Sequence, residues 1–145
     1  MNADHLFESL RARPVAVYKY VDAQGQLLFE KLRYEPKRFV QRRPVGNGHY
    51  EYKLDGIEKP LYRLPELLIA NEIFVCEGEK DCDNVLAAFA ERAIGNVRIA
   101  ATTNFGGAGK WSDEDSKYFA GKRVVILADN DEAGRRHGLP TYPSI

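Results

Sequence analysis

Three acidic residues of this chain could do chemistry together: Glu77, Asp129 and Asp131. Glu77 follows the apolar run 73–76 and Asp129 follows the apolar run 124–128, so each comes directly after a strand-like segment. Because the carboxyl ends of parallel strands meet at one edge of a sheet, we expect these side chains to lie together. Carboxylates crowded in this way repel one another, and a hard cation such as Mg²⁺ or Mn²⁺ relieves the repulsion.

A metal ion held by such a site bridges phosphate oxygens, stabilises the charge of phosphoryl transfer and lowers the pKa of an attacking hydroxyl. Asp129 and Asp131 are two positions apart, so in an extended stretch their side chains share a face. The alternative interpretation is structural: the two aspartates only cap a helix that begins near Glu132. The presence of Glu77 at an equivalent strand end favours the metal site.

These segments also resemble three other known motifs in part. A calcium loop beginning at Asp129 fails because Ala133 and Pro140 stand where ligands are needed. A P-loop at residues 104–111 fails because Asn104 replaces its first glycine and a tryptophan replaces its final Ser or Thr. A phosphatase of the haloacid dehalogenase type also places Asp-x-Asp after a strand, but there the motif usually opens the domain. It stays as a weaker alternative.

The elements that must position these residues change in kind along the chain. Residues 15–21 and 27–34 predict a β-hairpin, and the prolines and glycines between 36 and 60 indicate further short strands and turns. From Pro65 onward strands alternate with helices, which predicts an α/β fold with a parallel sheet. The run 124–128 is typical of a strand buried on both faces. The expected elements of this second part are strands at 73–76, 97–101 and 123–128, an amphipathic helix from Cys82 to Ala93 and a short helix at 113–115.

Composition places the chain among globular proteins. It has 145 residues, 44% hydrophobic and 29% charged, with no net charge. The longest apolar run is too short to cross a bilayer and no export signal is present, so we expect a cytoplasmic protein with no membrane partner. Cys76 and Cys82 lack the spacing of a zinc site and are expected to be reduced and structural.

The densest basic cluster of the chain lies in its first half, next to aromatic residues. Positive charge beside aromatic faces is typical of single-stranded nucleic-acid binding, through phosphate contacts and base stacking. The alternative is a solvated hairpin surface with its aromatic side chains packed inward. The cluster consists of Lys37, Arg38, Arg42 and Arg43, with Tyr34 before it and Phe39 within it.

Residues 73–83 (IFVCEGEKDCD) and 124–136 (VVILADNDEAGRR) resemble the two signature motifs of the Toprim domain, a glutamate after one strand and Asp-x-Asp after a later one. That family includes bacterial DNA primases, topoisomerases and nucleases. Residues 32–44, 61–68 and 101–111 are similar to segments of primase-like proteins of phages and mobile elements. The resemblance implies a β-rich segment at 1–64, a Toprim (Rossmann-like) parallel-sheet core at 65–139 and a tail at 140–145. Because residues 136–140 break the expected last helix, we expect a core truncated at its C-terminus.

The resemblance also implies roles for individual residues. Glu77 matches a general acid/base or metal-linked glutamate, Asp129 and Asp131 match a metal-binding pair, and Asp81 matches a further acidic, metal-linked position. Three basic residues are expected to contact phosphate, with a solvated surface position as the alternative for each: Lys80, Lys110 and Arg135.

Three functions follow from this resemblance. The first is a primase-like, Mg²⁺-dependent nucleotidyltransferase that uses single-stranded DNA and nucleoside triphosphates, with a replicative helicase module as a partner. The second is a Toprim nuclease that hydrolyses phosphodiesters with the same ions. The third is a non-catalytic nucleic-acid-binding remnant. A topoisomerase is less favoured because no nucleophilic tyrosine is identifiable.

Overall fold

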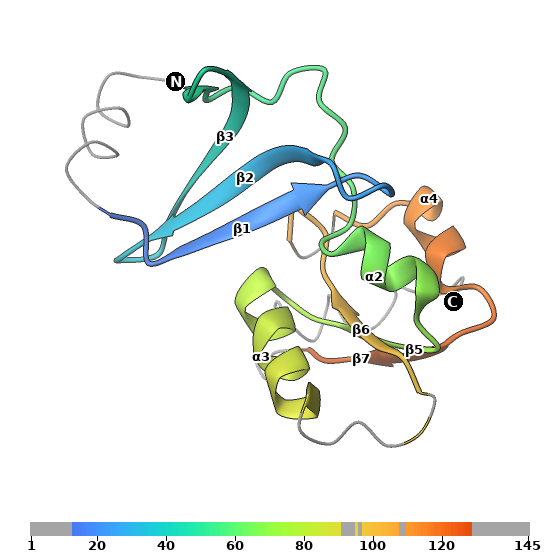
Figure 1. The fold of residues 1–145 in the computed structure, drawn as a ribbon. Coiled ribbons are helices and arrows are strands. Elements are labelled where there is room, and N and C mark those ends of the chain that lie inside the picture. The colour runs from blue at the N-terminus through green and yellow to red at the C-terminus, as the bar shows by residue number, and fades with distance from the viewer. Residues whose placement is uncertain (1–12, 91–94, 96, 108–109, 129–145) are drawn as a thin grey trace.

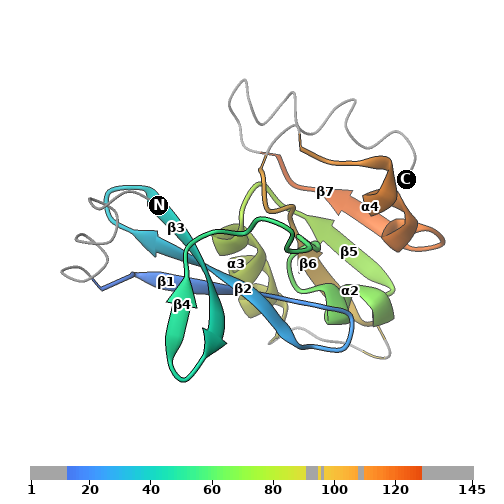
Figure 2. The same ribbon diagram turned by 90° about the horizontal axis from the view of Figure 1, so that it is seen from above.

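Two sheets of different kinds organise the chain. The computed structural model describes residues 13–90, 95, 97–107 and 110–128. In these residues an antiparallel sheet of order β1-β2-β3-β4 comes first, and a parallel sheet of order β6-β5-β7 follows it (Figures 1 and 2). The strands are β1 (Ala16–Val21), β2 (Leu27–Tyr34), β3 (Arg38–Gly46), β4 (His49–Glu51), β5 (Glu72–Val75), β6 (Ile99–Thr102) and β7 (Arg123–Ile126). The helices are α2 (Leu64–Ile69), α3 (Glu79–Ala90), α4 (Asp113–Ser116) and the 3-10 helix η1 (Lys117–Phe119). The predicted α/β class with a β-rich N-terminal part is confirmed.

The first hairpin forms where the sequence predicts it. The Asp22 carboxylate accepts hydrogen bonds from the backbone N–H groups of Gln24 and Gln26, both at 2.9 Å. Gly25 takes a φ of 86°, a left-handed conformation that favours glycine. The turn brings Tyr20 opposite Phe29, and their rings stack with centroids 4.6 Å apart. These buried rings face the rest of the molecule rather than solvent.

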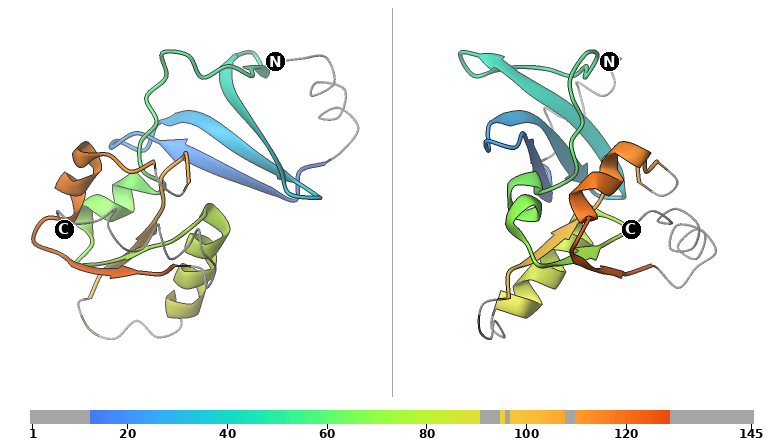
Figure 3. Two further views of the ribbon diagram at one scale, coloured as in Figure 1. Left: turned by 180° about the vertical axis from the view of Figure 1, so that it is seen from behind. Right: turned by 90° about the vertical axis from the view of Figure 1, so that its right-hand side faces the viewer.

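The parallel sheet has β5 in its centre, paired with β6 on one side and β7 on the other. One face packs against α2 and η1, and Leu67 and Phe119 are buried there with Ile73. The other face packs against α3, where Phe74 contacts Phe89 with ring centroids 5.0 Å apart. The buried rings of β1 and β2 join this second core, and the antiparallel sheet lies across one end of α3 (Figure 3).

Two elements differ from the sequence prediction. The strand β7 is half-buried rather than buried on both faces, because in the described part of the chain only β5 pairs with it. The sequence does not predict helix α2, since Pro65 marks the boundary between the two predicted parts of the chain. Proline in fact stands in the first turn of α2, where its missing N–H has no helical partner to lose. No helix among the described residues has the length and apolarity needed to span a membrane.

Candidate functional site

Glu77 lies just beyond the carboxyl end of the central strand. The ladder continues past β5, because the Cys76 N–H donates to the Thr102 carbonyl at 2.9 Å and the Leu127 N–H donates to the Val75 carbonyl at 2.8 Å. Glu77 therefore emerges between the ends of β6 and β7, and its Oε1 atom is buried. The sequence prediction of an acidic site assumed that the strands before Glu77 and Asp129 are parallel, and β5 and β7 do pair in parallel.

The other half of the predicted acidic site follows β7. Asp129, Asp131 and Arg135 lie outside the described residues, so their positions stay predictions. Asp81 belongs to the described residues and is exposed in the first turn of α3. Its Oδ2 atom lies 3.9 Å from the position that a Cβ atom would have at Gly78. An acidic residue there also stabilises the positive end of the helix dipole. Within the described ranges, no three His, Cys, Asp or Glu side chains gather so that they could hold a metal ion.

Glu79 was not singled out from the sequence, yet it is a buried carboxylate with partners on the antiparallel sheet. It is 4% exposed, and it accepts hydrogen bonds from the Tyr20 hydroxyl at 2.9 Å and from Lys31 Nζ at 2.8 Å. Burial, and then the negative charge of Glu79, raise the pKa of the Tyr20 hydroxyl far above its ordinary value. Glu79 thus connects α3 to the antiparallel sheet.

The glycine-rich loop after β6 is fixed to the same place. Lys31 Nζ also donates to the Phe105 carbonyl at 3.4 Å. The Phe105 ring meets the rings of Tyr20 and Phe29 edge-on, at centroid distances of 5.9 and 5.2 Å. We call Tyr20, Lys31, Glu79 and Phe105 the junction, because they join the two sheets, α3 and the loop.

Lys110, predicted to contact phosphate, is exposed at the end of this loop. Its side chain lies against Gly106, where an added Cβ would come within 2.8 Å of Lys110 Cγ. The Lys110 N–H donates to the Gly107 carbonyl at 3.3 Å. A side chain at position 106 would therefore displace Lys110, which explains the glycine.

Two buried polar side chains follow β6, and the sequence reasoning did not single them out as functional. Thr103 is fully buried and Asn104 is 6% exposed. Among the described residues, neither the Thr103 hydroxyl nor either polar atom of the Asn104 carboxamide has a hydrogen-bond partner. A buried polar group left without a partner costs about 1–3 kcal/mol. In the sequence, Asn104 is only the residue that breaks a P-loop motif, and its burial cannot be seen there.

Lys80 lines an open cavity of about 360 Å³ between α3 and the antiparallel sheet. Arg33 of β2 and Tyr18 of β1 line it from the other side, as does Asp83 of α3. Asp83 is already engaged, because the Tyr62 hydroxyl donates to it at 3.0 Å. Lys80 itself is exposed. The cavity is therefore lined by two cations, Lys80 and Arg33, from elements far apart in the sequence.

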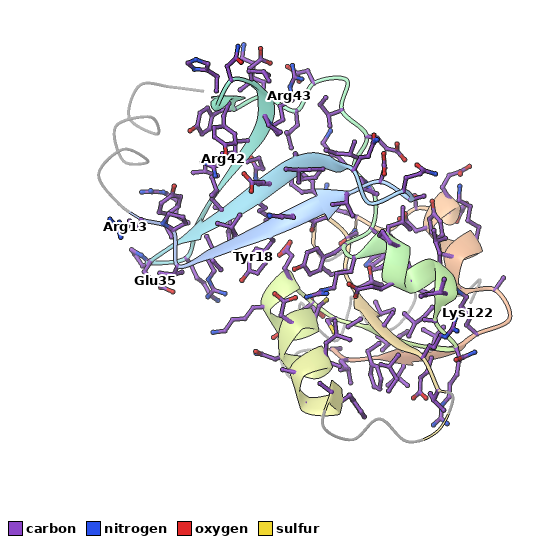
Figure 4. All side chains as sticks on the ribbon, in the orientation of Figure 1. Arg13, Tyr18, Glu35, Arg42, Arg43 and Lys122 are labelled. Carbon is purple, nitrogen blue, oxygen red and sulfur yellow. The ribbon has the colours of Figure 1, made fainter. Side chains whose placement is uncertain are left out.

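The predicted basic cluster divides into two kinds of residue. Arg42 donates to the largely buried Glu30 at 2.8 Å and Arg43 forms an ion pair with Glu51, so both guanidinium groups bind carboxylates of their own sheet. Figure 4 shows Arg42 and Arg43 on the part of the antiparallel sheet that lies away from α3. Lys37 is exposed in the β2–β3 turn. The role of the cluster in binding nucleic acid stays a prediction.

The guanidinium of Arg38 lies over the Tyr34 ring at 4.8 Å, and Tyr34 is buried while Phe39 is 38% exposed. One aromatic side chain is therefore packed inward, as the structural alternative expects, and the other remains accessible. The two cysteines are both buried and free, which agrees with the structural role expected for them.

Comparison with known proteins defines the fold. No protein-family model and no curated protein matches the chain. Among solved structures, it is similar to the primase fragment of the bacteriophage T7 primase-helicase, at 22% identity and a TM-score of 0.60, over 88% of this chain and 49% of that one. It is also similar to a bacteriophage T7 structure of a DNA polymerase with primase domains bound to an RNA/DNA hybrid and dTTP, at 22% identity and a TM-score of 0.59. That match covers 83% of this chain and 55% of the other.

The chain therefore has a primase-like fold and spans about half the length of the neighbours it matches.

Proposed function

We propose that the chain is a Toprim-type, primase-like module that acts on nucleic acid by Mg²⁺-dependent nucleotidyl transfer. One observation carries the proposal: β5, which leads into Glu77, and β7, which leads into Asp129, are parallel neighbours in a fold similar to that of a phage primase fragment. Carboxylates that leave neighbouring parallel strands at the same edge have the geometry that a metal-dependent phosphoryl-transfer site needs.

The donor set fits Mg²⁺ or Mn²⁺. Glu77, Asp129 and Asp131 would hold the ion, with Asp81 as a further acidic group, and all four offer the carboxylate oxygens that these cations prefer. The buried Oε1 of Glu77 is of the type that such an ion binds. When bound, Mg²⁺ would supply charge stabilisation to the oxygens of the reacting phosphate.

The chain's own residues would do the rest. The Glu77 carboxylate would take the proton of an attacking 3′-hydroxyl, as a general base placed at the sheet edge. The hydroxyl oxygen would form a bond to the α-phosphorus of the nucleoside triphosphate, and pyrophosphate would leave with the electron pair of the broken P–O bond. Lys80 in α3 and Lys110 at the end of the glycine-rich loop are exposed cations and would attract the triphosphate, as would Arg135. The positive charge of these side chains would favour binding of the triphosphate, whereas Glu77 would act on the oxygen of the attacking 3′-hydroxyl.

Single-stranded template would be held by the antiparallel sheet. Lys37 and Arg38 in and after the β2–β3 turn offer phosphate contacts, and the partly exposed Phe39 ring, which has Lys31 and Arg33 over it at 4.9 and 5.9 Å, offers a stacking surface on the other face of β3. Arg42 and Arg43 would contribute less, because carboxylates of the sheet already bind them. The solved neighbours are described with an RNA/DNA hybrid and dTTP and as part of a primase-helicase. Nucleic acid, nucleoside triphosphates and a replicative helicase are accordingly the proposed partners of this chain.

The test is to incubate the purified chain with Mg²⁺, nucleoside triphosphates and a labelled single-stranded template. Template-dependent primers, lost in Glu77→Gln and Asp129→Asn, are the expected result. Glu58→Gln, an exposed glutamate before α2, is the matched control and should keep full activity. Degraded template would show nuclease chemistry at the same carboxylates, and binding without product would show a non-catalytic module; either result would overturn nucleotidyl transfer.

A further inference from the structure

Asn104 has a buried side chain whose hydrogen-bonding capacity is unused in the described part of the chain. It is 6% exposed, and neither its Nδ2 nor its Oδ1 has a partner there. Native proteins satisfy nearly all buried polar groups, and exceptions often mark places where a ligand completes the hydrogen bonding. The position of Asn104 in the fold indicates which ligand that is.

Asn104 lies next to Glu77 across the sheet. The register that pairs Val75 with Thr102 continues through the hydrogen bond from the Cys76 N–H to the Thr102 carbonyl. Glu77 and Asn104 each come two residues after this last pair, so the same register would bring them level at the carboxyl edge of the sheet. β5 and β6 are parallel neighbours, so their carboxyl ends lie at one edge of the sheet.

The backbone around Asn104 is fixed on both sides. The Thr103 carbonyl accepts a hydrogen bond from the Tyr62 N–H at 3.0 Å, and the Asn104 carbonyl accepts one from the Gly107 N–H at 3.3 Å. The next residue, Phe105, is anchored by the junction. The carboxamide is therefore held in place before any ligand arrives, which lowers the entropy cost of binding.

A carboxamide and a carboxylate at one edge have complementary chemistry. Glu77 in its ionised form only accepts hydrogen bonds, whereas Asn104 Nδ2 carries two N–H donors. A phosphate group offers acceptor oxygens and carries negative charge, so it needs such a donor and makes the stronger, charge-assisted kind of hydrogen bond with it.

We propose that Asn104 is a phosphate-binding residue of this site, whose Nδ2 donates to a phosphate oxygen of the incoming nucleoside triphosphate. The inference rests on the proposed function and deepens it, because it assigns the group that orients the substrate beside Glu77. A buried water bound to the carboxamide is the competing explanation, and it makes Asn104 structural.

The experiment measures binding of ATP with Mg²⁺, of inorganic tripolyphosphate with Mg²⁺, and of Mg²⁺ alone to the full chain by calorimetry. Asn104→Leu keeps the branching of the side chain, although it is larger, and removes the donors; Asn104→Asp keeps the shape but replaces the donors with negative charge. Both variants should bind ATP and tripolyphosphate at least about tenfold more weakly, as expected for a hydrogen bond to a charged group. Thr103→Val, which removes the neighbouring buried hydroxyl, should bind like the wild type.

Several outcomes would overturn the inference. These are wild-type affinity in both Asn104 variants, an equal loss in Thr103→Val, or a wild-type chain that binds neither ATP nor tripolyphosphate. Tighter Mg²⁺ binding by Asn104→Asp with unchanged ATP affinity would make residue 104 a cation-binding position instead. In a fourth titration with a single-stranded oligonucleotide, a loss confined to that ligand would overturn the inference, because it would assign the donor to the nucleic-acid backbone rather than to the triphosphate.

The melting temperatures of the Asn104 variants distinguish a loss of ligand binding from a loss of structure. Asn104→Leu should melt at or above the wild type, because it removes an unsatisfied buried group; a lower melting temperature would support the bound-water explanation. Failure of the proposed function is distinguishable, because a chain that binds ATP through Asn104 but makes no primers leaves this inference intact.

Discussion

The junction and the sheet edge lie within a few residues of each other in sequence, but their polar groups are arranged in opposite ways. At the junction, the buried Glu79 carboxylate is met by a hydroxyl and an ammonium group within 3 Å. At the edge, the buried Asn104 carboxamide has no such partner among the described residues. Polar groups that hold a fold together are satisfied within it, whereas groups that bind a ligand keep capacity for it. The comparison indicates a structural role for Glu79 and is consistent with the binding role proposed for the edge.

The largest expected effect comes from removing the junction carboxylate. Glu79→Ala leaves the Lys31 ammonium and the Tyr20 hydroxyl without their acceptor in a buried place, so we expect a loss of about 3 kcal/mol in the free energy of unfolding. Urea denaturation followed by circular dichroism measures it. Glu58→Ala, at an exposed position, should leave the midpoint unchanged. Equal midpoints for the two variants would mean that the junction does not stabilise the fold.

A smaller effect is expected when only the hydroxyl is removed. Tyr20→Phe keeps the ring stacked on Phe29 and loses the hydrogen bond to Glu79, so it should cost about 2 kcal/mol. The same denaturation experiment on Tyr20→Phe, Glu79→Gln and the double variant gives the coupling energy between the two side chains. Strictly additive losses would show that they do not act as a unit.

High pH should weaken the junction through Tyr20. Its pKa is raised in the folded chain by burial and by Glu79, so the neutral hydroxyl is favoured by folding. The stabilisation is complete below about pH 10, where an unfolded tyrosine is neutral, and falls as pH rises above that value. The stability difference between wild type and Tyr20→Phe should therefore shrink by up to about 1.4 kcal/mol per pH unit above pH 10. A difference that stays constant between pH 9 and 11 would contradict the assignment.

The smallest effect is expected for the ion pair on the far side of the antiparallel sheet. Arg43 and Glu51 are both partly exposed, so Arg43→Gln should change the free energy of unfolding by less than about 0.5 kcal/mol. Arg42 binds a largely buried carboxylate and should matter more. A larger loss in Arg43→Gln than in Arg42→Gln would reverse this ranking.

Local sequence patterns predicted the elements well but not the contacts between them. The hairpin strands, β5 and the helix after Glu77 all lie close to their predicted positions, because alternation and helical periodicity are local properties. The parallel order β6-β5-β7 agrees with the inference that joined the strand ends. Helix α2 escaped notice because a proline can either break a helix or begin one.

The roles of Glu79 and Asn104 could not be predicted for a different reason. Glu79 looks like an ordinary acidic residue in the first turn of a helix, and its partner Lys31 is 48 residues away. Asn104 looks like a residue of a polar loop until its burial is known. Both depend on tertiary packing, which a single sequence does not display.

The most direct test of the central comparison measures Mg²⁺-dependent primer synthesis and unfolding free energy together in Glu77→Gln and Glu79→Gln. Glu77→Gln should lose at least about 100-fold in synthesis, the usual contribution of a general base, with little change in stability. Glu79→Gln should be clearly less stable but keep synthesis within about tenfold of the wild type at a temperature where it is folded. Full synthesis in Glu77→Gln, or a chemical defect confined to Glu79→Gln, would contradict the account.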